Sequence, residues 1–97
     1  MSARFTPGPW KVLNFERDEA FEIEGGGCTL ALLHYDVGAW TARTESEANA
    51  HLIAAAPELY EALETVLVNN RTGATGQRAR EGWAKAIAAL AKARGEA

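Results

Sequence analysis

Apolar and polar residues alternate in two short stretches near the start of the chain. Residues 10–15 and residues 21–24 both show the period-two pattern of a β-strand, in which successive side chains point to opposite sides of the backbone. Phe21 and Ile23 are expected to face the core, with the neighbouring glutamates in water. Three glycines at 25–27 follow directly. Because glycine adopts positive φ angles at low cost, they predict a tight turn into a further strand.

Residues 28–35 form the third predicted strand, and both of its faces are mostly apolar. One face carries Cys28, Leu30, Leu32 and His34, and the other carries Thr29, Ala31, Leu33 and Tyr35. A strand with two apolar faces is usually covered on both sides. The helices of so short a chain cover only one side, and we expect Leu30 and Leu32 to lie under them. Leu33 and Tyr35 then point to the opposite side.

That opposite side of the predicted sheet carries four apolar side chains, namely Leu13, Phe15, Leu33 and Tyr35. Contiguous apolar patches beyond a few hundred Å² are uncommon on monomers. We therefore predict that this face contacts a second copy in a homodimer, or a partner protein on which the chain becomes fully ordered. In the alternative interpretation, the loop that contains Trp40 folds back over the face.

A longer segment, residues 45–69, repeats apolar side chains at spacings of three and four, which is the pattern of an amphipathic helix. Thr44 and Glu47 have the spacing of a capping box, so we predict that this helix begins at Thr44. Pro57 interrupts the segment, because proline lacks a backbone N–H and clashes with the preceding turn. The segment is therefore one helix kinked close to Pro57, or two helices with Pro57 at the start of the second.

A final helix is predicted over residues 79–94, with Trp83, Ile87 and Leu90 as a stripe that we expect to be buried. Together the elements predict an α+β fold in a single domain that spans the whole chain. In this fold a three-stranded antiparallel β-meander, at residues 10–36, precedes two to three helices that pack on one of its faces.

The composition narrows the class of protein. Of the 97 residues, 47% are apolar and 24% are charged, which is typical of a folded soluble domain. The longest apolar run, residues 52–57, is far shorter than the ~20 residues that cross a bilayer, so we expect no membrane contact. Cys28 is the only cysteine, which excludes an internal disulfide and makes the reducing cytoplasm the expected location.

The net charge of −3 is divided unevenly along the chain. Residues 1–70 carry four basic and eleven acidic side chains, whereas residues 71–97 carry six basic and two acidic ones. In one interpretation the acidic and basic parts attract each other and suit the helix dipoles. In the other, the basic part forms a patch for a phosphate or a nucleic acid. The acidic balance of the whole chain argues against general binding to duplex DNA.

No residue pattern matches a catalytic or metal-binding motif. Cys28 and His34 share a predicted strand face but lie about 20 Å apart along it, which is too far to share a metal ion. Glu22 and Glu24 are spaced like an acid–base pair, but adjacent strand glutamates are usually a solvated edge. We therefore expect a protein that is not an enzyme and holds no cofactor.

Tyr35, Trp40 and Arg43 are the candidate binding residues, because two aromatic rings lie close in sequence to a guanidinium group. Such a combination stacks on a nucleotide base or anchors a protein interface. Arg78 and Arg80, at the start of the last predicted helix, add the bidentate donors that suit a phosphate. A site for a signalling nucleotide would combine the two groups.

Two stretches carry a resemblance to known proteins. They are the TPGPW sequence at residues 6–10 and the EANAHLIAAAPEL sequence at residues 47–59. Their order, with short strands between them and an alanine-rich basic segment after them, resembles a family of small proteins encoded by tailed phages and prophages. His51 stands where a basic residue is common in that family. The resemblance implies a phage or mobile-element accessory protein in the bacterial cytoplasm, and it brings no catalytic residues with it.

Small phage proteins of this kind often act by binding, and the resemblance implies the same here. The leading hypothesis is a non-enzymatic protein that binds and inhibits a host protein, a component of an antiphage defence system of the CRISPR type. The first alternative is a binder that sequesters a signalling nucleotide. The second is a DNA-associated regulator that uses the basic C-terminal helix.

Overall fold

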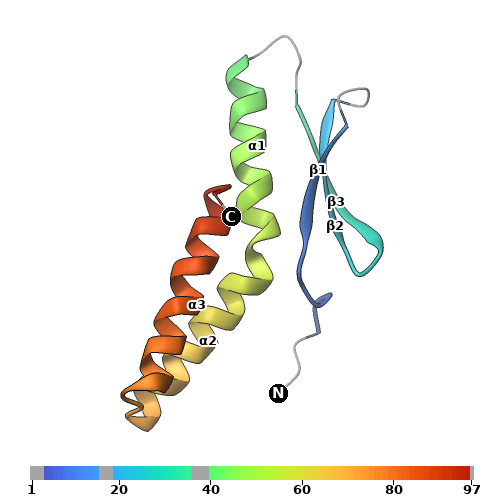
Figure 1. Cartoon of the computed structure of the whole chain (residues 1–97). Helices are drawn as coiled ribbons and strands as arrows, with labels where there is room; N and C mark the ends of the chain where they lie inside the picture. Colours follow the sequence, from blue (N-terminus) through green and yellow to red (C-terminus); the bar gives the residue numbers. More distant parts are fainter. Residues whose placement is uncertain (1–3, 16–18, 36–39, 97) are drawn as a thin grey trace.

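Three strands are followed by three helices along the chain (Figure 1). The computed structural model describes residues 4–15, 19–35 and 40–96, with the side chains of the first helix described from residue 43 onward. The elements are β1 (Lys11–Phe15), β2 (Ala20–Gly25), β3 (Cys28–His34), α1 (Trp40–Ala54), α2 (Ala56–Thr72) and α3 (Gln77–Ala93). The strands pair antiparallel in the order β1-β2-β3, which is a meander. The predicted α+β architecture is confirmed.

The core lies between the sheet and α1. Phe21 and Ile23 of β2 are the largest fully buried side chains, as the alternation of that strand predicts. They pack with Tyr35 against Ala50 and Ala54 of α1, whose short side chains let the helix approach the sheet closely. Half-buried residues surround this cluster: Trp10, Val12, Ala31 and Leu33.

The predicted faces of β3 are partly wrong. Leu33 packs into the core and Tyr35 is buried, whereas Leu32 is exposed on the other side of the sheet. The reason is a β-bulge, because Ile23 pairs with Ala31 while the next residue of β2 pairs with Thr29. At a bulge, two residues of one strand lie opposite a single residue of the other strand. The side chains of β3 after the bulge therefore lie on the face opposite to the one that strict alternation predicts.

Leu30 is the extra residue at this bulge. Its side chain lies beside Gly25 and Trp10, on the core side as predicted. Leu33, three residues later, lies on the same side although strict alternation would place it on the opposite one. The predicted contact face is therefore divided: Leu33 and Tyr35 face α1, and Leu13 and Phe15 face away from it.

Pro57 separates the first two helices, as predicted. α1 ends at Ala54, α2 begins at Ala56, and Pro57 lies buried in the first turn of α2. The start predicted for α1 is wrong, because the helix begins at Trp40, four residues before Thr44. The capping-box spacing of Thr44 therefore occurs inside the helix, where the preceding Thr-Ala-Arg sequence extends the helical backbone.

α2 and α3 form a helical hairpin that projects beyond the sheet. Figure 1 shows α1 and α2 nearly end to end, α3 folded back along α2, and the sheet against α1. The molecule measures 52 × 26 × 16 Å and its radius of gyration is 15.9 Å, against about 13 Å for a compact domain of 100 residues. α1 is therefore the main cover of the sheet, and most of α2 and α3 lies away from it.

Candidate functional site

The hairpin of α2 and α3 is held together by small side chains. Ala62, Gly82 and Ala89 are its buried residues apart from Pro57. A Cβ atom added to Gly82 would lie 2.7 Å from the side-chain nitrogen of Asn69, which itself donates a hydrogen bond to the Arg78 carbonyl at 2.9 Å. The two helices therefore approach each other closely, and no large apolar side chain is buried between them in the described part of the chain.

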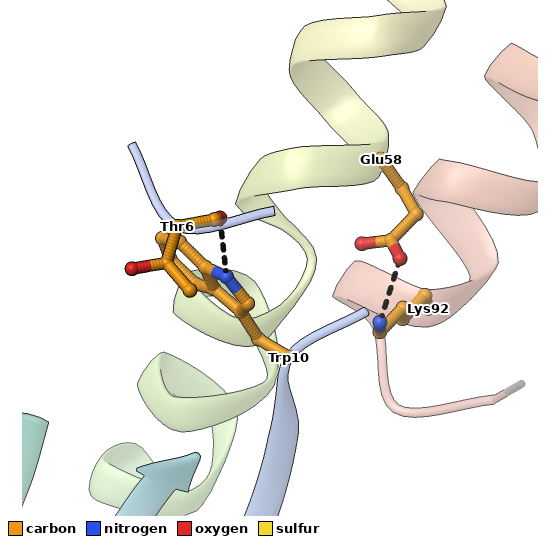
Figure 2. A network of polar contacts seen from close by, with 4 residues as sticks. All are labelled: Thr6, Trp10, Glu58 and Lys92. Carbon is orange, nitrogen blue, oxygen red and sulfur yellow. Dashed lines mark hydrogen bonds and ion pairs between the residues drawn. The ribbon is translucent and has the colours of Figure 1, made fainter. Parts of the chain in front are cut away.

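Ion pairs connect the same two helices along one side. Lys85 Nζ lies 3.1 Å from Glu61 Oε1, and Lys92 Nζ lies 3.0 Å from Glu58 Oε2 (Figure 2). Basic side chains of α3 thus contact acidic side chains of α2, which agrees with the interpretation that the two parts of the chain attract each other. Farther along, Arg94 donates to Glu96 at 2.9 Å and lowers the pKa of that carboxyl group.

The opposite side of the hairpin is apolar and exposed. Five large side chains there keep between 51% and 67% of their area in contact with solvent. They are Leu63, Leu67, Trp83, Ile87 and Leu90, and we call them the hairpin face. The prediction that Trp83, Ile87 and Leu90 are buried is therefore wrong, because helical periodicity identifies an apolar stripe but not the surface that covers it.

A groove of about 230 Å³ runs along the hairpin face. Its lining is entirely apolar and consists of Leu59, Ala62, Leu63, Val66, Trp83, Ala86 and Leu90. A second groove, of about 280 Å³, adjoins it toward the loop between the helices, and Trp83 lines both. Trp83 therefore stands between two depressions in an uncharged surface.

The outer face of the sheet, which points away from α1, is a second exposed surface. Leu13, Glu22 and Leu32 lie side by side across the three strands of this face. Thr29 Oγ1 donates to Glu22 Oε2 at 2.5 Å, which holds the carboxylate over the sheet. Phe15 lies two residues beyond Leu13 on the same side, and it is exposed like Leu32. The outer face is thus mixed, with apolar side chains around a carboxylate.

The predicted cluster of Tyr35, Trp40 and Arg43 is only partly formed by described side chains. The Arg43 guanidinium lies 5.5 Å from the centre of the Tyr35 ring, at cation–π distance. Tyr35 is buried, packs on Phe21 with ring centres 5.1 Å apart, and directs its hydroxyl at Asn14 Oδ1 at 3.4 Å. Its role is therefore structural. The Trp40 side chain lies outside the described residues.

Arg78 and Arg80 lie far from that cluster. They belong to the first turn of α3, and in Figure 1 the start of α3 and the start of α1 are at opposite ends of the molecule. The structure does not bring these arginines together with Arg43. The predicted nucleotide site, which combines both groups, is not assembled by the side chains that the structure describes.

The TPGPW segment has a structural role that the sequence pattern did not reveal. Trp10 Nε1 donates to the Thr6 carbonyl at 2.9 Å, which closes the segment on itself (Figure 2). Phe5 contacts the rings of Trp10 and Tyr60 edge to face, with ring centres 6.4 Å and 5.0 Å apart. Gly8 lies against Pro57. Residues 5–10 therefore pack against the first turns of α2 through these contacts.

The described residues contain neither a metal-type cluster nor a membrane-spanning helix. No group of three or more His, Cys, Asp or Glu side chains is placed to hold an ion within residues 4–15, 19–35 and 40–96. No helix in the same ranges has the length and apolar character needed to cross a bilayer.

Comparison with protein families gives a match over the whole chain. The family described as Salmonella phage P22 protein Y8K6 matches residues 1–97. The chain belongs to this phage protein family. No curated protein and no solved structure matches it. The resemblance to small phage proteins is thus confirmed at the level of the family, and membership in the Y8K6 family makes the chain a phage-type protein.

Proposed function

We propose that this Y8K6-family protein is a non-enzymatic accessory protein that binds and inhibits a host protein through the outer face of its sheet. The observation that carries the proposal is the position of Leu32, which is half exposed and lies next to Glu22 on the outer face. Figure 1 shows the helices on the other side of the sheet. Leu13 and Phe15 of β1 lie on the outer face with Leu32. Exposed apolar groups on an uncovered sheet face are typical of contact surfaces.

The composition of the outer face suits a partner that the protein meets after it has folded. Interfaces between proteins that fold separately and then bind are about as apolar as an ordinary protein surface, whereas permanent interfaces are more apolar. Around its three apolar side chains the outer face carries Lys11 and Glu24 opposite each other on neighbouring strands, with Glu22 next to them. Polar groups in this position fix the orientation of a partner and select against wrong ones.

The charge of the outer face defines the chemistry of the partner. Glu22 lies between Leu13 and Leu32, so a complementary host surface carries an apolar depression next to a lysine or an arginine. The phage family supports a host target, and we propose a component of an antiphage defence system of the CRISPR type. Inhibition then results from occupation of a basic surface that the host protein needs for its own ligand.

The proposal is tested by capture of host proteins on the immobilised full-length chain, followed by affinity measurements with each captured protein after purification. Leu32→Arg is expected to abolish binding, because it places a cation and its hydration shell in the centre of the outer face. Leu52→Arg is the matched control, since Leu52 has nearly the same exposed fraction, 54% against 53%, but lies on α1.

A cellular assay tests inhibition separately from binding. Expression of the wild-type chain in a host with an active CRISPR-type system is expected to restore phage plating, and Leu32→Arg is expected to remove that effect while Leu52→Arg keeps it. Binding and plating that both survive Leu32→Arg would contradict the assignment of the outer face. A chain that captures no host protein would contradict the proposed function itself.

A further inference from the structure

We propose that the hairpin face is the contact between two copies of this chain, which join through a two-fold axis into a four-helix bundle. Each copy contributes α2 and α3, two helices of 17 residues each. The inference concerns a surface that the proposed function does not use, so it goes beyond that function and fails or succeeds independently of it.

The first argument is that the hairpin has no core of its own. The buried residues at the contact between α2 and α3 are Ala62, Gly82 and Ala89, and the five large side chains of the hairpin face are each more than half exposed. In proteins most of the stability of a helix comes from packing of its apolar side, because a helix of this length is marginal by itself in water. A hairpin built in this way requires a cover for its apolar side.

The second argument is the area of the hairpin face. Its five side chains are each more than half exposed, and together they present on the order of 500 Å² of apolar surface. A standard interface buries about 800 Å² on each partner, and about 65% of a homodimer interface is apolar, which again gives about 500 Å². The hairpin face therefore has the apolar area that one half of a stable dimer needs.

The third argument is charge, which favours a second copy over a foreign partner. All seven residues that line the groove are apolar, and none of them takes part in the two ion pairs between the helices, Glu58 with Lys92 and Glu61 with Lys85. An uncharged face gives a foreign partner nothing to select by. Another copy presents the same apolar groove, and none of the seven residues that line it carries a charge that has to be desolvated.

The geometry suits an isologous contact. In a two-fold dimer the same residues of both copies meet, so the ridge that Trp83 forms in one copy can enter the groove beside Trp83 in the other. Two antiparallel hairpins stacked by their apolar sides form a four-helix bundle, in which such residues make the common core. Trp83 is then the central anchor of the interface, as tryptophan often is.

The mass of the full-length chain in solution is the direct test. Sedimentation equilibrium from 1 to 100 µM is expected to give twice the chain mass of 10.4 kDa. Ile87→Glu is expected to raise the dissociation constant of the dimer by about 30-fold or more, because it puts a charge into the shared core. Leu32→Glu makes the same type of change on the outer face and is expected to leave the dimer intact.

A second measurement needs no variant and therefore stands even if Ile87→Glu does not fold. In an equimolar mixture of isotope-labelled and unlabelled wild-type chains, intermolecular nuclear Overhauser effects are expected between the Trp83 ring and the methyl groups of Leu63 and Ile87. A monomer at 100 µM would overturn the proposal. So would intermolecular effects that involve Leu13 and Leu32, or a host protein whose binding depends on Ile87 and not on Leu32.

Discussion

Lys92, in the last turn of α3, donates a hydrogen bond to Glu58 Oε2, in the first turn of α2, at 3.0 Å. Each charge lies at the helix end that its sign favours, since a carboxylate is stabilised near an N-terminus and an ammonium group near a C-terminus. The side chains are also partly shielded, with 33% of Glu58 and 25% of Lys92 exposed. The pair therefore closes the end of the hairpin opposite its loop.

Glu58→Gln is expected to lower the free energy of unfolding by about 1 kcal/mol, because it removes both the ion pair and the favourable charge at the start of α2. Urea denaturation followed by circular dichroism measures this loss. Glu61→Gln is the control, since the pair of Glu61 with Lys85 is more exposed, and its expected loss is below about 0.5 kcal/mol. Equal losses in the two variants would contradict the role assigned to Glu58.

Phe21→Ala is expected to lower the free energy of unfolding by about 3–5 kcal/mol, because Phe21 is one of the two large side chains that are fully buried. Trp83→Ala, measured in the Ile87→Glu background so that association does not contribute, is expected to cost less than about 1 kcal/mol. Thermal and urea denaturation provide both values. A cost for Trp83→Ala that approaches that of Phe21→Ala would mean that Trp83 is buried within one copy.

Gly25→Ala is expected to destabilise the chain by about 1–3 kcal/mol through overpacking. An added Cβ would lie 2.5 Å from Trp10 Cδ1 and 2.8 Å from Leu30 Cδ1, and the indole is fixed by its hydrogen bond to Thr6. Gly82→Ala is the comparison. There the added Cβ would lie 2.7 Å from Asn69 Nδ2, so the amide has to turn and give up its hydrogen bond to the Arg78 carbonyl, which costs about 1 kcal/mol. A gain of about 1 kcal/mol in helix propensity offsets this loss.

Melting temperatures of these two glycine variants distinguish the outcomes. The Gly25 variant is expected to melt several degrees below the wild type, whereas the Gly82 variant is expected to stay close to it. A Gly25→Ala protein of wild-type stability would mean that the indole of Trp10 moves aside without cost.

Leu33→Arg is expected to unfold the protein, while Leu32→Arg is expected to change its stability by less than about 1 kcal/mol. Leu33 packs against the core under α1, whereas Leu32 points to solvent from the outer face. Circular dichroism at low concentration and amide hydrogen exchange in β2 measure the difference. Two variants with equal stability would contradict the register of β3 after its bulge.

Most of the architecture can be predicted from local patterns. The three strands, their antiparallel order and the break at Pro57 follow from alternation, turn glycines and proline chemistry, and the structure has all of them. The alternation in β2 predicts its two faces correctly, because Glu22 and Glu24 mark one face as the side toward solvent. β3 carries no such mark, since both of its faces are apolar, and a one-residue bulge then decides which leucine is buried.

The candidate sites could be predicted less well, because they depend on packing between distant parts of the chain. The periodicity of α3 places Trp83 in the apolar stripe of that helix. Whether the stripe is buried depends on the direction in which α3 returns along α2, which leaves it exposed to solvent. In the same way, the shortness of the chain suggests that Arg43 and Arg78 lie close enough to belong to one binding site. Their separation follows from the length of the helices between them.

The elongated shape has a consequence for hydrodynamic measurements. A particle with a radius of gyration of 15.9 Å has a larger Stokes radius than a compact chain of the same mass, so it diffuses more slowly and elutes earlier in gel filtration. A single copy of 10.4 kDa would therefore elute as a heavier globular protein, in the direction expected for a dimer. Sedimentation equilibrium and light scattering depend on mass and not on shape, so they distinguish an elongated single copy from a dimer.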